Sequence, residues 1–70
     1  MDKVRFYEEM SKILEVDYNE KKLSKAVIGT DIDSLAMLNI ISFYEENFNI
    51  TLDPEKFMGK NLEDLYKLIG

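Results

Sequence analysis

Only one hydroxyl group in this sequence has neighbours that suggest chemistry. Ser34 lies between Asp33 and Leu35, and the apolar-rich stretch AMLNIISFYEENF follows directly. This pattern predicts that Ser34 occupies the first turn of an amphipathic helix. Unpaired backbone N–H groups and the aligned peptide dipoles favour an anion at such a position. Ser34 is therefore a good acceptor for a covalently attached phosphodiester.

Two residue types that often carry out chemistry are missing. The chain has 70 residues, with no cysteine and no histidine. Their absence excludes disulfides, thiolate nucleophiles, zinc clusters, imidazole bases and Ser-His-Asp triads. We therefore expect no intrinsic catalysis. An enzyme that uses Asp31 and Asp33 as an acid and base pair is the alternative, but so short a chain can scarcely enclose the substrate pocket it needs.

Asp31 and Asp33 could also begin a calcium-binding loop. An EF-hand loop starting at Asp31 needs an oxygen ligand at its fifth position, glycine at the sixth and glutamate at the twelfth. Leu35, Ala36 and Ser42 stand at those positions. The sequence therefore predicts no metal site.

The negative charge of the chain is concentrated around Ser34. The net charge is -5, but residues 26–55 alone contain six acidic residues and no basic one. The rest of the chain has eight acidic against nine basic residues. This distribution argues against nucleic acid as a partner and favours proteins with basic surfaces. The alternative is a solvated acidic face with no role.

We expect a soluble cytoplasmic protein. No charge-free apolar run approaches the length needed to cross a bilayer, and the charged start MDKVRFYEE is not a signal peptide.

The sequence predicts four helices and no strand. Asp2 can cap a first helix that runs to about Leu14. The connection over residues 15–33 is long, and we expect apolar residues within it to hold it across the bundle. Asp53 and Pro54 predict a short third helix, because proline at the first helical position loses no hydrogen bond. The apolar face of the first helix comprises Val4, Phe6, Tyr7, Met10, Ile13 and Leu14, and the connection is held by Leu23, Val27 and Ile28.

Asn61, with Asp64 three residues later, predicts the start of a last helix. Leu62, Leu65 and Ile69 share one stripe of that helix. We therefore expect an all-α fold: a four-helix bundle with a long loop between helices 1 and 2 and a short third helix. The whole chain, residues 1–70, forms a single domain.

A helical wheel separates two faces of the central helix. We expect the first face to be core; it comprises Met37, Ile40, Ile41, Tyr44 and Phe48, with Ala36 and Phe43 at its edge. The opposite face comprises Leu35, Leu38, Asn39, Ser42, Glu45 and Glu46. Two leucines among polar residues are typical of a docking patch with a charged rim. The alternative is that the loop of residues 15–33 covers them.

The chain has four tyrosines, Tyr7, Tyr18, Tyr44 and Tyr66. No base lies near them in any recognisable motif. We expect them to be core or boundary residues whose hydroxyl groups remain in water.

From Leu14 to Ile69 the sequence resembles the acyl and peptidyl carrier proteins. Ser34 with Asp33 and Leu35 matches the D-S-L setting of that family, and Glu45, Glu46 and Phe48 match its E-E-x-F ending of the second helix. Many members have glycine two residues before the aspartate, whereas Asp31 stands here. That departure affects the expected turn geometry of the loop and not the attachment site.

The resemblance implies that Ser34 carries a 4′-phosphopantetheine arm derived from coenzyme A, whose thiol holds acyl or aminoacyl groups as thioesters. It implies that Asp33 shapes the helix start. Leu35, Leu38, Asn39, Ser42, Glu45 and Glu46 would contact partners. Those partners would be a phosphopantetheinyl transferase, a loading enzyme for acyl or aminoacyl groups, and downstream synthases or transferases with basic docking surfaces. We expect a monomeric, discrete carrier, although an excised domain remains an alternative.

Two questions stay open at this point. A carrier-like acidic adaptor that is never loaded is the alternative function. The cargo could be fatty acyl, aminoacyl or polyketide, since these carriers share one frame. Bulky aromatic residues in the expected core predict that a long acyl chain is poorly sequestered, with Met37 as the one adaptable residue at the expected entrance.

Overall fold

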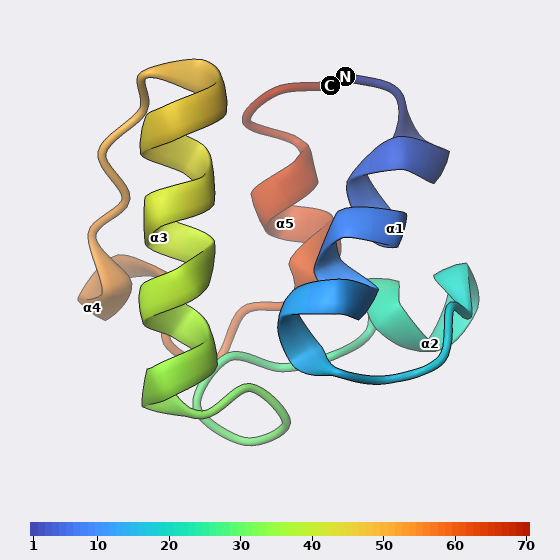
Figure 1. Ribbon diagram of the computed structural model, residues 1–70. Helices are drawn as coiled ribbons and strands as arrows, with labels where there is room; N and C mark the ends of the chain where they lie inside the picture. Colours follow the sequence, from blue (N-terminus) through green and yellow to red (C-terminus); the bar gives the residue numbers. More distant parts are fainter.

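The computed structural model describes residues 1–70 and contains five helices and no strand. The helices are α1 (Lys3–Leu14), α2 (Glu20–Ser24), α3 (Ser34–Phe48), α4 (Pro54–Phe57) and α5 (Leu62–Tyr66), as Figure 1 shows. The predicted all-α class is confirmed.

The helix count differs from the prediction, because the loop of residues 15–33 contains α2. Asn19 caps this helix: its side-chain oxygen accepts a hydrogen bond from the backbone N–H of Lys22 at 3.1 Å. Leu23 is buried and fixes α2 against the rest of the chain. The structure therefore has five helices where the sequence predicted four, since a one-turn helix leaves almost no periodic pattern.

Local capping explains where the other helices start. Asp2, Asp33 and Asp53 each accept a hydrogen bond from a backbone N–H in the following turn. Asn61 and Asp64 form a reciprocal capping box at the start of α5, with distances of 3.0 and 3.2 Å. These starts agree with the prediction.

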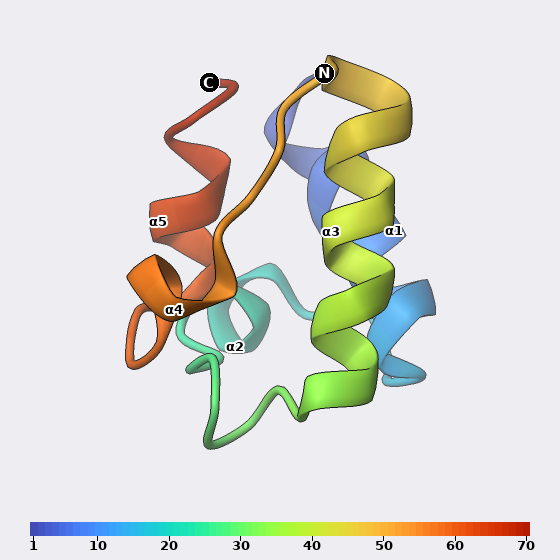
Figure 2. The ribbon, with the colours of Figure 1, turned by 90° about the vertical axis from the view of Figure 1, so that its left-hand side faces the viewer.

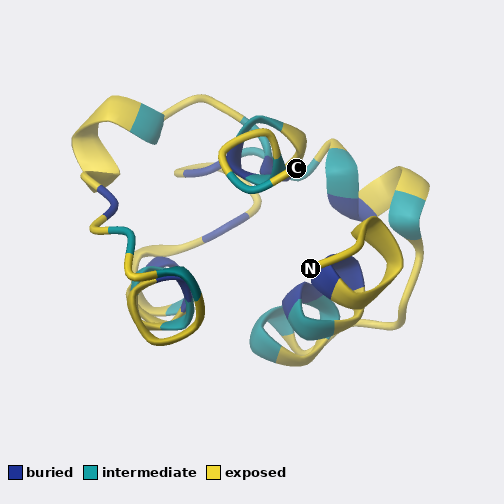
Figure 3. Cartoon of the chain, turned by 90° about the horizontal axis from the view of Figure 1, so that it is seen from above, coloured by how far each residue is buried: buried dark blue, intermediate teal, exposed yellow.

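Helices α1, α3 and α5 turn their buried faces toward a shared centre (Figure 3). Helix α1 contacts both α2 and α3, and α2 contacts α5. The first residue of α3 lies at one end of the molecule, together with the loop that precedes it, whereas both chain termini lie at the opposite end (Figures 1 and 2).

The core consists of twelve buried hydrophobic residues: Phe6, Tyr7, Met10, Leu23, Ile28, Ile32, Met37, Ile40, Tyr44, Leu52, Leu62 and Leu65. Ile41 and Phe48 of the predicted core face are half-buried. Val4 does not belong to the core, since it is 54% exposed in the first turn of α1. The apolar stripe predicted for the last helix is confirmed, with Leu62 and Leu65 buried and Ile69 half-buried.

Two tyrosine hydroxyl groups lie away from water, which corrects the expectation that they stay wet. Tyr44 on α3 donates a hydrogen bond to the backbone carbonyl of Leu65 on α5 at 2.5 Å. The hydroxyl of Tyr7 is buried with no hydrogen-bond partner. Only Tyr18 is exposed, at 44%.

The segment before α3 is fastened to the segment between α4 and α5. Val27 forms an isolated antiparallel bridge with Asn61, and the backbone N–H of Ile28 donates to the carbonyl of Lys60 at 2.8 Å. Leu23 and Ile28 are buried and Val27 is half-buried, which confirms that they hold this connection. These contacts fix the position from which α3 begins.

Candidate functional site

Ser34 is the first residue of α3, as predicted. Asp33 is extended, and its carboxylate accepts a hydrogen bond from the backbone N–H of Ala36 at 2.8 Å. This cap stops the chain from continuing the helix backward and holds Ser34 at the helix start. The side chain of Asp33 therefore shapes the start of α3.

The hydroxyl of Ser34 is free. Ser34 is exposed, and its side chain makes no hydrogen bond, whereas the hydroxyls of Ser11 and Ser24 donate to backbone carbonyls of their own helices. The backbone N–H groups of Ser34 and Leu35 also lack a partner within the chain. An anion attached to Ser34 would meet these groups and the positive end of a fifteen-residue helix.

The loop before Ser34 closes on itself without glycine at position 31. The carbonyl of Val27 accepts hydrogen bonds from the N–H groups of Thr30, Asp31 and Ile32. Asp31 also bonds to Val27 through its side chain: the carboxylate accepts a hydrogen bond from the N–H of Val27 at 2.9 Å. The left-handed conformation falls on Gly29 instead, with φ of 95°. Asp31 therefore leaves the turn undistorted.

The leucines beside Ser34 are uncovered. Leu35 is 70% exposed and Leu38 is 60% exposed, so the alternative in which the preceding loop covers them is wrong. Asn39 is exposed next to them. These three residues form an apolar surface with a polar neighbour within about one turn of Ser34.

Glu45 and Glu46 lie far from Ser34. Both are exposed, but they are eleven and twelve residues further along α3. At about 1.5 Å per residue, this separation is roughly 16–18 Å along the helix axis. Ser42 lies between the two groups. The predicted partner residues thus form a long strip and not a compact ring around Ser34.

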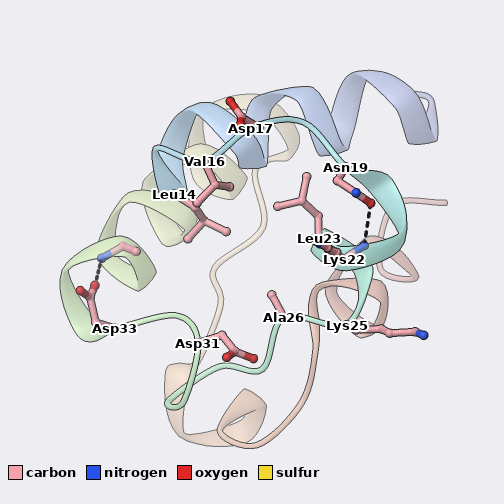
Figure 4. A pocket seen from close by; sticks show the side chains of 11 residues that line it. Leu14, Val16, Asp17, Asn19, Lys22, Leu23, Lys25, Ala26, Asp31 and Asp33 are labelled. Atoms are coloured by element: carbon pink, nitrogen blue, oxygen red, sulfur yellow. Dashed lines mark hydrogen bonds between the residues drawn. The ribbon is translucent and has the colours of Figure 1, made fainter.

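Sequence reasoning missed a cavity of about 540 Å³ beside the start of α3 (Figure 4). Its eleven lining residues include Asp33 and Ala36, which flank Ser34. Met37, the predicted entrance residue, is buried and does not line it. One sequence signal could have indicated the cavity: Ala26 and Ala36 are the only alanines of the chain, and both line it.

A comparison with curated proteins identifies the family. The chain is 39% identical over 56 residues to a protein named acyl carrier protein homolog from Mycoplasma genitalium, strain G37. The matched region covers 79% of this chain and 67% of that relative. The chain belongs to the acyl carrier protein family.

Acyl carrier proteins are carriers and not enzymes, which confirms the expected absence of intrinsic catalysis. No protein-family model matches this chain. No solved structure matches it either. None of the helices has the length and apolar character required to cross a membrane.

Proposed function

We propose that this chain holds acyl or aminoacyl groups as thioesters on a 4′-phosphopantetheine arm attached to Oγ of Ser34. The observation that supports this best is the free, exposed hydroxyl of Ser34 at the start of α3. The residues around it fit the group, because two unpaired backbone N–H groups and the helix dipole favour the phosphate. When bound, the arm supplies the thiol chemistry.

This chain has no group that could activate Ser34. It contains no histidine, and the carboxylate of Asp33 already accepts the N–H of Ala36. The base that removes the hydroxyl proton therefore belongs to the transferase. Oγ of Ser34 then attacks the phosphorus of coenzyme A that bears the pantetheine, and adenosine 3′,5′-bisphosphate leaves.

Leu35 and Leu38 form the centre of the docking surface for partner enzymes. Both side chains are mostly exposed although they are large and apolar, and they lie beside the attachment point. Residues 26–55 carry all the net negative charge, so the partners have basic surfaces: a phosphopantetheinyl transferase, a loading enzyme, and a downstream synthase or transferase. Glu45 and Glu46 extend the contact along α3.

The decisive experiment is intact mass after incubation with coenzyme A and a promiscuous phosphopantetheinyl transferase. We expect the parent chain to gain one phosphopantetheine and Ser34→Ala to gain none, with unchanged helical circular dichroism. Ser42→Ala is the matched control, since Ser42 is another exposed serine of the same helix, and it should be loaded like the parent.

Modification that persists in Ser34→Ala would disprove the assignment to Ser34. A parent chain that is never modified, yet still binds basic partner proteins through Leu35 and Leu38, would favour the unloaded adaptor instead.

A further inference from the structure

The cavity beside Ser34 lies where four segments meet. The end of α1, helix α2, the loop before α3 and the first turn of α3 all contribute to it (Figure 4). Its volume of about 540 Å³ falls within the range of about 300–1,000 Å³ that small-molecule sites occupy. Asp33 and Ala36 belong to its wall, so it opens directly beside the attachment point.

The wall combines apolar surface with groups that can form hydrogen bonds. Leu14 and Leu23 reach into the cavity from opposite sides, and Ala26 faces them from below in Figure 4. Asn19 uses its side-chain oxygen to accept the N–H of Lys22, which leaves its amide N–H groups free to donate. The small side chains of Ala26 and Ala36 leave room that larger residues would fill.

Resting on the proposed function, we infer that the phosphopantetheine arm of Ser34 folds back into this cavity when it is not delivering cargo. The chemical groups of the arm match those of the cavity wall. The arm has a dimethyl-substituted carbon, which suits Leu14, Leu23 and Ala26, and two amide groups, which suit Asn19. The covalent link supplies an effective concentration on the order of millimolar, so even a weak site is substantially occupied.

The arm could otherwise enter the core between α3 and α5, but that core is closed. The ring of Phe6 contacts those of Tyr66 and Tyr44 there, at centroid distances of 5.2 and 6.3 Å. The hydrogen bond from Tyr44 to Leu65 ties the two helices together. Entry on that side would displace close-packed rings, whereas the cavity beside Ser34 is already open.

The test is NMR spectroscopy of the loaded protein, after intact mass has shown one phosphopantetheine on Ser34. We expect nuclear Overhauser contacts between the methyl groups of the arm and the methyl groups of Leu14 and Leu23. Loading should also shift the backbone amide signals of Leu14, Leu23 and Ala26.

Ala26→Leu should fill the cavity and abolish these contacts, while Ser34 is still loaded. Thr51→Leu is the matched control, because it adds a leucine at an exposed position outside the cavity wall, and it should leave the contacts intact. A loaded parent whose arm shows no contact with Leu14 or Leu23 would overturn this inference alone. A parent that gains no mass would overturn the proposed function as well.

Discussion

Tyr7 and Tyr44 are both fully buried, but only one of them has a hydrogen-bond partner. Tyr44 donates to Leu65, whereas the hydroxyl of Tyr7 has no acceptor. Removing an unpaired buried hydroxyl relieves a desolvation penalty, so Tyr7→Phe should raise the free energy of unfolding by about 1 kcal/mol. Tyr44→Phe should lower it by about 1 kcal/mol, because a hydrogen bond is lost. Urea denaturation measures both, and equal changes in the two variants would contradict the assignment.

Tyr7 also predicts that the protein loses stability at high pH. Burial and, to a smaller extent, the nearby carboxylates of Glu63 and Glu20 together raise the pKa of Tyr7 from 10.0 to about 12. Because the folded state holds the proton longer than the unfolded state, this contribution is complete below pH 10.0 and is lost as the pH rises to about 12.

Tyr7→Phe removes this titration. The urea midpoint of the parent should therefore fall more between about pH 9 and about pH 11 than that of Tyr7→Phe. Tyr44 remains in both proteins, and burial, which is the main cause of its raised pKa, acts in both. Identical falls in the two proteins would show that Tyr7 does not titrate in this range.

Helix α3 carries the wrong charge at its end for its own stability. Glu45 and Glu46 lie in its last turn, where no basic residue is present, and the helix dipole disfavours negative charge there. Replacing both by lysine should raise the free energy of unfolding by about 1 kcal/mol. The same double variant should slow loading by the transferase, because it weakens attraction to basic partner surfaces. Thermal unfolding and loading rate can be measured on the same sample.

The matched control is the double variant Glu8→Lys with Glu15→Lys. It changes the net charge by the same amount at exposed positions outside residues 26–55. Its loading rate should stay close to that of the parent. The difference between the two double variants should also shrink in high salt, since the Debye length is about 8 Å at physiological ionic strength. Parent-rate loading of Glu45→Lys with Glu46→Lys at low salt would exclude a role for this charge.

Helix starts could be predicted from the sequence because capping is local. Asp2, Asp33 and Asn61 each bond to a backbone group only three residues away. Helix α2 could not be predicted in this way, because a five-residue helix shows no periodicity and depends on burial of Leu23. Val4 was misplaced for a related reason: its apolar character did not reveal that no other helix covers the first turn of α1.

In the candidate site too, features local to one helix could be predicted from the sequence and tertiary features could not. Ser34, Asp33, Leu35 and Leu38 occupy the predicted positions, since a helical wheel gives relative directions within one helix. The cavity depends on α1, α2 and the loop meeting at the start of α3. That arrangement is tertiary, so no periodic pattern in the sequence could indicate it.

At the scale of the whole molecule, the aromatic core limits where cargo can rest. Phe6, Tyr7, Phe43, Tyr44, Phe48 and Tyr66 form one network of ring contacts, with centroids 5.1 to 6.4 Å apart. A long acyl chain would have to displace several of these rings. We therefore expect an eight-carbon acyl thioester to remain outside the core.

NMR chemical shifts show whether the cargo enters the core. The shifts of the arm-bearing protein are compared before and after loading with that acyl group or with an amino acid. Small shifts at Ile40, Tyr44 and Ile69 are the expected result for both cargoes. Large shifts at these residues on acyl loading, together with slower hydrolysis of the thioester, would show that the core opens and would favour a fatty-acyl carrier.

The two chain termini lie at the end of the molecule opposite to the start of α3 (Figures 1 and 2), and Ser34 is the first residue of that helix. A bead, a sensor surface or a fluorescent protein joined to either terminus would therefore stand away from the serine and from Leu35 and Leu38. We expect a chain immobilised through its C-terminus to accept phosphopantetheine at the rate of the free chain. This geometry makes the protein suitable for surface-bound assays, in which one immobilised sample is passed from one candidate loading enzyme to the next.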